Sequence, residues 1–186
     1  MKEGKEIFGY WLLLLKHARY EGDVDFEKLT RPLSVCGKRT PADLNGITFG
    51  QLCQLQELKN IVEMFVRVPV ILLGVNEEEV MRAKTVEVVR LSAWVAQELK
   101  RINGLFEKIN RVPSGEEIRA GLGKLHHGMF GMCDWYAKRM GITDHEEVMR
   151  TAWVRIYQCM KIDNENRAFE ERLQKIYMND RKAKRR

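Results

Sequence analysis

Apolar residues recur every three or four positions over most of the chain, and this spacing places them along one face of an α-helix. The spacing is clearest over residues 49–66, 77–109, 115–140 and 144–178. The stretch 77–109 is the longest regular one, with apolar residues at Val88, Leu91, Val95, Ile102, Phe106 and Ile109. The pattern predicts a mainly α fold that resembles a helical bundle. No internal repeat is evident along the sequence.

Helix starts and stops are also predictable. In a capping box, a Ser, Thr or Asn side chain and a Glu or Gln three residues later satisfy backbone N–H groups of the first turn. Such pairs occur at Thr48/Gln51, Asn76/Glu79, Ser114/Glu117 and Thr143/Glu146. Pro69 should end or bend the first helix, and Gly141 should end the third. The last helical stretch is expected to break near Arg150 or at the polar "DNEN".

The segment "NRVPSGEE" is the clearest boundary, because Pro and Gly bracket a helix cap there. It divides the chain into a mainly helical N-terminal domain, 1–110, and a helical C-terminal domain, 111–180. Residues 181–186 form a basic tail. Within the first domain, turn chemistry at Gly37 is consistent with a short β-hairpin near residues 31–40.

Composition and charge narrow the class of protein. Hydrophobic residues make up 45% and charged residues 31% of the 186, which is typical of a globular chain. The net charge is +6, but "DRKAKRR" alone carries +4, so the rest is nearly balanced. The four cysteines are far apart, which favours reduced thiols in a cytosol. The apolar runs 7–15 and 65–75 are too short to cross a bilayer, so we expect a cytoplasmic protein.

The stretch "GKLHHGMFGMCDWYAKRMGITDHEEVM" concentrates histidine and cysteine. On a continuous helix, His126 and Cys133 would share one edge, while His127 would point to the opposite face near Asp134. Structural zinc takes four ligands, often in close pairs, and such pairs are missing from the sequence. "HEEVM" also lacks the second histidine of a metalloprotease motif. We therefore predict a non-enzymatic protein without catalytic residues, metal or other cofactor.

The same stretch is rich in glycine and methionine. Glycines inside a helical pattern fit a kinked helix, a close approach by another helix, or a hinge. Methionine adapts its shape, so a surface with several Met residues suits a variable partner, although a Met stripe is also common in cores. A binding surface and a core therefore remain alternatives here.

The segments "PADLNGITFGQLCQLQEL" and "VPVILLGVNEEEVMRAKTVEVVRLSAWVAQELKRINGLFEKI" resemble the tail assembly chaperones of long-tailed bacteriophages and related prophage proteins. The later "FGMCDWYAKRMGITDHEEVM" and "WVRIYQCMKI" resemble the small helical part that such chaperones often carry. The resemblance covers a little over half of the chain and rests on apolar patterns.

The resemblance implies a binding function in the cytoplasm of a bacterial host. Such chaperones coat the hydrophobic tape-measure protein and present it to the tail-tube protein, and they leave before the virion matures. A homo-oligomer is compatible with this role. The residues expected to contact a partner are Met129, Met132, Trp135, Tyr136, Trp153 and Tyr157. The alternative for each is a place in the core.

Three other functions remain open. The first is a small helical nucleic-acid-binding protein, with binding that weakens steeply in salt. Its contact residues would be Arg181, Lys182, Lys184, Arg185 and Arg186. The second is a structural component of the virion. The third is a metalloprotein or thiol enzyme that uses Cys133.

Overall fold

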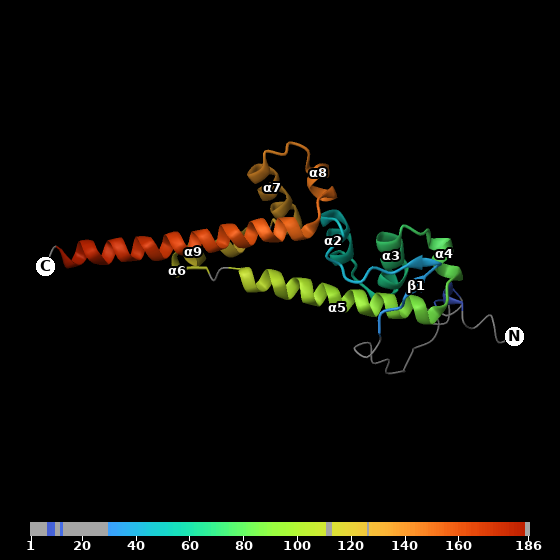
Figure 1. Ribbon diagram of the computed structural model, residues 1–186. Coiled ribbons are helices and arrows are strands. Elements are labelled where there is room, and N and C mark those ends of the chain that lie inside the picture. The colour runs from blue at the N-terminus through green and yellow to red at the C-terminus, as the bar shows by residue number, and fades with distance from the viewer. Residues whose placement is uncertain (1–6, 10–11, 13–29, 111–112, 126, 185–186) are drawn as a thin grey trace.

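The chain folds mainly into α-helices, as the apolar spacing predicts (Figure 1). In this computed structural model, the described residues are 7–9, 12, 30–110, 113–125 and 127–184. They contain one two-stranded hairpin, eight α-helices and a short 3-10 helix. In order these are β1 (Ser34–Val35), β2 (Lys38–Arg39), α2 (Phe49–Gln56), α3 (Ile61–Leu73), α4 (Glu77–Arg82), α5 (Thr85–Ile109), α6 (Gly115–Arg119), η3 (Leu122–Lys124), α7 (Gly128–Met140), α8 (His145–Arg150) and α9 (Trp153–Ala183).

The predicted hairpin near residues 31–40 is confirmed. Strands β1 and β2 are antiparallel, with Ser34 opposite Arg39 and Val35 opposite Lys38. Cys36 and Gly37 form the turn with φ values of 50° and 71°, a left-handed conformation that glycine adopts readily.

Three of the four predicted capping boxes are confirmed, at Thr48, Asn76 and Ser114. The fourth prediction, at Thr143, is wrong. Asp144 caps α8 instead, with its carboxylate accepting from the backbone N–H of Glu146 at 2.9 Å. An aspartate side chain serves this purpose as well as a threonine does, so adjacent candidates are hard to separate by sequence.

Three predicted helices are interrupted. The first breaks before Asn60, whose side chain caps a new helix, and α3 continues through Pro69 to Gly74. The second breaks at Ala83 and Lys84, which are extended. The third, 115–140, divides into α6, η3 and α7, with Gly121 and Gly128 in the left-handed region.

Two further predicted boundaries are confirmed. Gly141 ends α7 with a φ of 68°, and the last helical stretch breaks after Arg150.

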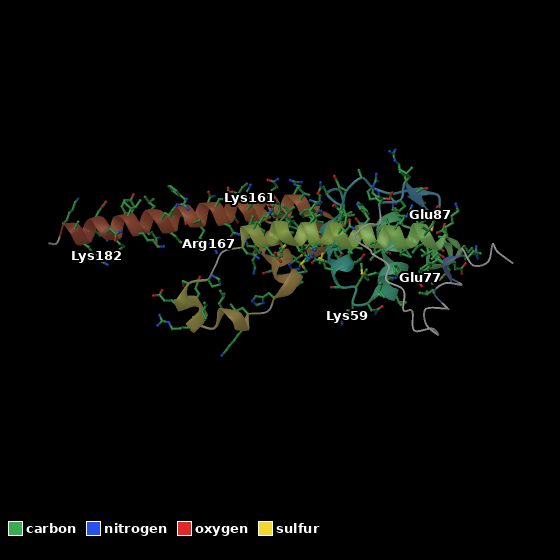
Figure 2. The ribbon with its side chains drawn as sticks, turned by 90° about the horizontal axis from the view of Figure 1, so that it is seen from below. Lys59, Glu77, Glu87, Lys161, Arg167 and Lys182 are labelled. Carbon is green, nitrogen blue, oxygen red and sulfur yellow. The ribbon has the colours of Figure 1, made fainter. Side chains whose placement is uncertain are left out.

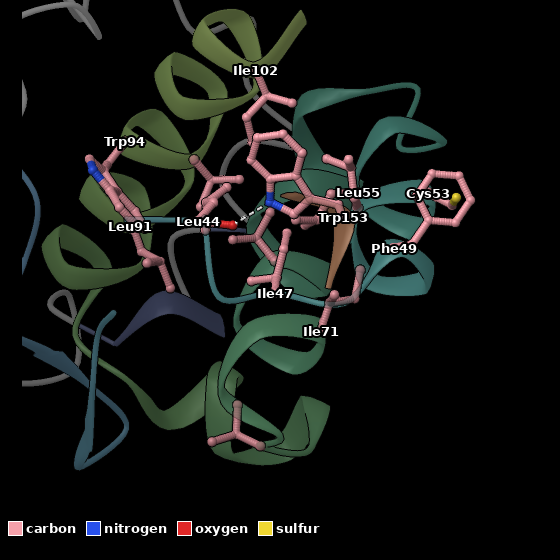
Figure 3. Packing of buried hydrophobic residues seen from close by; sticks show 14 of the residues in the cluster. Leu44, Ile47, Phe49, Cys53, Leu55, Ile71, Leu91, Trp94, Ile102 and Trp153 are labelled. Atoms are coloured by element: carbon pink, nitrogen blue, oxygen red, sulfur yellow. Dashed lines mark hydrogen bonds between the residues drawn. The ribbon is translucent and has the colours of Figure 1, made fainter. Parts of the chain in front are cut away.

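The buried side chains form one continuous core, and Trp153 is one of its largest members (Figure 3). Trp153 is 1% exposed, and its indole Nε1–H donates to the Leu44 carbonyl oxygen at 2.7 Å. The core contains residues from both sides of the predicted boundary near residue 110, and α2 packs against α8. The division into two domains stays a prediction, but the two parts share this core.

The fold contains a repeated element, so the expectation of no internal repeat is wrong. The sequence "EEVMR" occurs at 78–82 and again at 146–150. In both places a helix ends at a left-handed glycine, a short helix carrying "EEVMR" follows, two extended residues come next, and a long helix begins. We call α3, α4 and α5 the first unit, and α7, α8 and α9 the second unit.

Each unit receives a Phe-Gly pair from an earlier segment. The Phe8 N–H donates to the Ala83 carbonyl at 2.9 Å, and the Phe49 N–H donates to the Thr151 carbonyl at 2.8 Å. Isolated β-bridges join Ile7 to Lys84 and Thr48 to Ala152. These bonds hold the residues between the short and long helices in an extended form, which explains why residues 77–109 are not one helix.

Helix α9 runs beside the last turns of α5 and then extends past the end of that helix (Figures 1 and 2). The Asn164 side chain donates to the Ile109 carbonyl at 2.9 Å, which marks the end of the contact between α5 and α9. Within the described ranges, no helix has both the length and the apolar character that crossing a membrane requires.

Candidate helix-binding groove

Three neighbouring hollows form one groove along α5. The first, of about 310 Å³, lies between α3 and α5, and the second, of about 830 Å³, shares Met64, Ala96 and Lys100 with it. The third, of about 260 Å³, shares Gln56, Asn103 and Glu107 with the second. We call this the α5 groove. It follows α5 from Ser92 to Asn110, which is roughly 27 Å at 1.5 Å per residue.

Small residues on α5 make the floor of the groove, and larger ones from three other helices make its walls. Ala96 is exposed in the first two hollows, and Ala93 lies beside it. Ile61 and Met64 come from α3, whereas Leu55 comes from α2. Methionines of α7 close the far end. The lining is therefore mainly apolar, with Met64 where the first two hollows meet and Met129 and Met132 at the far end.

Polar groups stand along the middle of the groove. The Gln56 side-chain amide donates to the Asn103 side-chain oxygen at 2.9 Å. Lys100 and Glu107 lie on the α5 side, both exposed. Charged groups at the edge of an apolar groove can orient a charged partner and keep the surface soluble.

An aromatic cluster lies under the far end of the groove. The Phe106 ring is 5.4 Å from the Tyr157 ring and 6.0 Å from the Trp153 ring, measured between centroids. Phe106 also lines the third hollow, together with Met129 and Met132. Four of the six predicted partner-contact residues therefore gather around one phenylalanine of α5.

The exposed fractions of these six side chains show which of them line the groove and which belong to the core. Met129 and Met132 are half-buried and line the groove. Trp135 and Tyr157 are half-buried outside the hollows that we describe. Tyr136 and Trp153 are only 2% and 1% exposed, so for them the core alternative is correct. Both were predicted as partner contacts because aromatic residues are favoured in interfaces, but the same residues also fill cores.

Sequence reasoning missed the α3 side of the groove. Ile61, which is 50% exposed, and Met64 line it, yet both lie in a stretch that the apolar spacing assigns to a helix core. The available signal was "LSAWVA" in α5, which puts Ser92, Ala93 and Ala96 close together. Small residues on a helix face leave room for another helix to approach.

The histidine and cysteine stretch is arranged differently from the prediction. His127 precedes α7, and the Asp134 carboxylate lies 3.7 Å from Nε2 of His145. Cys133 Sγ is 3.9 Å from the His145 carbonyl oxygen. His126 lies outside the described residues. Among the residues that the structure describes, no three His, Cys, Asp or Glu side chains are placed to share a metal ion.

The buried thiols are held in the protonated form. Burial raises the pKa of Cys53 to about 11, with Glu57 adding to the effect. Burial also raises the pKa of Cys133, and the carboxylates of Asp134 and Glu146 raise it further. A thiolate is the nucleophile in thiol chemistry, so both groups are poorly reactive at neutral pH.

The predicted basic tail is partly helical. Arg181 and Lys182 lie in the last turn of α9, Lys184 follows as its cap, and all three are exposed. Arg185 and Arg186 lie outside the described residues. The exposed basic residues remain available to an acidic partner.

Comparison with known protein families, curated proteins and solved structures finds no match to this chain.

Proposed function

We propose that the protein is an assembly chaperone that binds an amphipathic helix of a longer protein in the α5 groove. The resemblance to phage tail assembly chaperones makes the tape-measure protein the proposed partner, with delivery to the tail-tube protein as the purpose. The observation that carries the proposal is the groove itself, a mainly apolar channel of helix length with polar groups along its middle and two methionines at its far end.

The chemistry of the lining supports a partner of variable sequence. Met64, Met129 and Met132 can each adjust three side-chain torsions to the shape of an apolar residue. A tape-measure protein offers many different helical segments, so an adaptable groove suits it better than a rigid one. Lys100 and Glu107 lie where they can meet polar residues that flank the apolar face of the bound helix.

The test is a pull-down of the tagged protein from cells that express its native gene cluster, with bound proteins identified by mass. In the Ala96→Arg variant, the new side chain would occupy the groove, and at least tenfold less of a very long helical partner should be recovered. Gln54→Arg is the matched control, because Gln54 is exposed on α2 and lies outside the groove. Equal recovery with both variants would contradict binding in the groove.

The same experiment separates the other functions. Recovery of nucleic acid alone, lost at high salt, would favour a nucleic-acid-binding protein that uses Arg181, Lys182 and Lys184. Persistence of the protein in purified particles would favour a structural virion component. An assembly chaperone should be absent from such particles.

A further inference from the structure

Helix α9 carries an exposed apolar stripe on the part that extends past α5. Ile162, Phe169 and Ile176 are seven residues apart and 47%, 57% and 55% exposed. Leu173 lies between the last two and is half-buried. Single exposed apolar residues are common, but four on one face of one helix form a surface suited to another helix.

The stripe has the spacing of a coiled coil. Cys159, Ile162, Asn166, Phe169, Leu173 and Ile176 follow one another at alternating steps of three and four residues. This is the heptad pattern in which two helices pack side chains of one into gaps of the other. A single polar residue among the six, Asn166, is a common feature of such seams.

We propose that α9 pairs with α9 of a second copy of this chain, in antiparallel orientation. Pairing Ile162 with Leu173 of the second copy puts Asn166 opposite Phe169 and Cys159 opposite Ile176. This register places every apolar residue of the stripe in the seam and leaves Asp180 outside it. Sliding the helices by one heptad would instead place Asp180 opposite Ile162, so the first register buries less charge.

Charges beside the stripe favour the antiparallel orientation. Glu165 and Arg172 lie on the same side of the stripe, so antiparallel helices put Glu165 opposite Arg172 of the second copy, twice by symmetry. Parallel helices would put Glu165 next to Glu170 of the second copy, which is repulsive.

One kind of like-charged contact remains in the antiparallel pair, between Glu170 and Asp163 of the second copy, and it too occurs twice by symmetry. Asp163 is already held by Arg139 of its own chain, at 3.0 Å. The guanidinium of Arg139 therefore lies close enough to offset the repulsion. The charges on both sides of the stripe can be satisfied in this orientation.

Sedimentation equilibrium of the full chain measures the pairing. We expect a dimer whose dissociation constant rises at least tenfold in Phe169→Glu, because a carboxylate would enter the apolar seam. Met178→Glu is the control, because Met178 is equally exposed on α9 but lies off the stripe. A monomer at every concentration, or equal effects of the two variants, would overturn the proposal.

Charge reversal tests the orientation. Glu165→Arg and Arg172→Glu should each weaken the dimer, and the two substitutions in one chain should restore it. If the double variant is no tighter than either single one, the contact between Glu165 and Arg172 is disproved.

Disulfide formation tests the register. In Ile176→Cys, the introduced thiol should form a disulfide with Cys159 of the second copy under mild oxidation. Adding Cys159→Ser should abolish that link. A persisting link that peptide mapping assigns to the two introduced thiols would mean a parallel pair, and a persisting link to another cysteine, such as the half-buried Cys36, would mean a different contact; either would overturn the antiparallel arrangement. None of these outcomes depends on what binds the α5 groove.

Discussion

The two units have the same backbone arrangement at the junction between the short and the long helix, but the residues around this junction differ. In both, a Phe N–H bonds to the carbonyl that follows "EEVMR", and the next glycine packs on the methionine of that sequence. The valine of each "EEVMR" is fully buried. The first residue of the long helix, however, is Thr85 in the first unit and Trp153 in the second.

The long helices also differ in how they are covered. In the first unit α3 packs along α5 and forms one wall of the α5 groove with it. In the second unit α7 packs mainly on α8 and reaches α9 through the Arg139–Asp163 ion pair, so α7 does not cover α9 as α3 covers α5. The comparison indicates that the junction maintains the fold, whereas the surfaces of the two long helices differ in what covers them.

The largest expected difference between the units is at the start of the long helix. Trp153→Ala should destabilise the protein by about 3–5 kcal/mol, because it leaves a cavity in the core and removes the indole N–H that donates to the Leu44 carbonyl. Thr85→Ala should cost less than half as much, because Thr85 is only half-buried. Urea unfolding of both variants measures this, and equal losses would show that the two starts are equivalent after all.

The next effect should be shared by both units. A Cβ at Gly9 would lie 3.0 Å from the Met81 carbonyl oxygen, and one at Gly50 would lie 3.1 Å from the Met149 carbonyl oxygen. Because these are backbone atoms, Gly9→Ala and Gly50→Ala should each cost about 1–3 kcal/mol. Gly104→Ala is the control, since a Cβ there meets nothing and alanine should stabilise α5. A loss of stability in only one of the two glycine variants would show that the two junctions are not equivalent.

The glycines that end α3 and α7 should behave alike. Gly74 and Gly141 have φ values of 62° and 68°, and a Cβ at either would meet nothing within 4 Å. Gly74→Ala and Gly141→Ala should therefore each lower the free energy of unfolding by about 1–2 kcal/mol through backbone strain alone. Thermal melts of the two variants should nearly coincide.

The smallest expected effect is a pH dependence of the free energy of unfolding, which should distinguish the two units. Seven residues before each terminal glycine, the first unit has Arg67, 3.4 Å from Glu77, and the second has Asp134, 3.7 Å from His145. The Lys138 ammonium, which bonds to the Asp134 carboxylate, lowers the pKa of Asp134, and His145 adds to this.

A carboxylate with a lowered pKa stabilises the fold above the ordinary aspartate pKa, and that stability is lost as the pH falls through the lowered value. Asp134→Asn should therefore be slightly less stable than the parent at pH 6 and match it near pH 2. Urea midpoints across that range test this. A constant difference at all pH values would mean that Asp134 acts through shape instead of charge.

Much of the fold is predictable from local sequence, because helix formation and capping depend on nearby residues. The boxes at Thr48, Asn76 and Ser114 are examples, as is the glycine stop at Gly141. The break at Ala83 could not be predicted that way, because it depends on a hydrogen bond from Phe8, which lies much earlier in the sequence. A direct comparison of "EEVMR" at both places would have revealed the repeat.

The candidate site was predictable only in part. Met129 and Met132 were identified by type and spacing, and they do line the groove. Periodicity could not separate them from Tyr136, because a stripe on a helix shows which side is apolar and leaves open what covers it. Ile61 and Met64 were missed because the groove depends on how α3 and α5 cross, which is a tertiary property.

The pairing of each Phe-Gly with its later junction also sets an order of events during folding. Phe49 must wait for Thr151, about a hundred residues further along the chain, and such distant contacts slow folding. During synthesis, α2 would leave the ribosome long before α8 exists to cover it. Helix α3 can cover one side of α2 early, but the side that α8 covers would stay exposed over that interval, and it is the first place to look for capture by host folding factors.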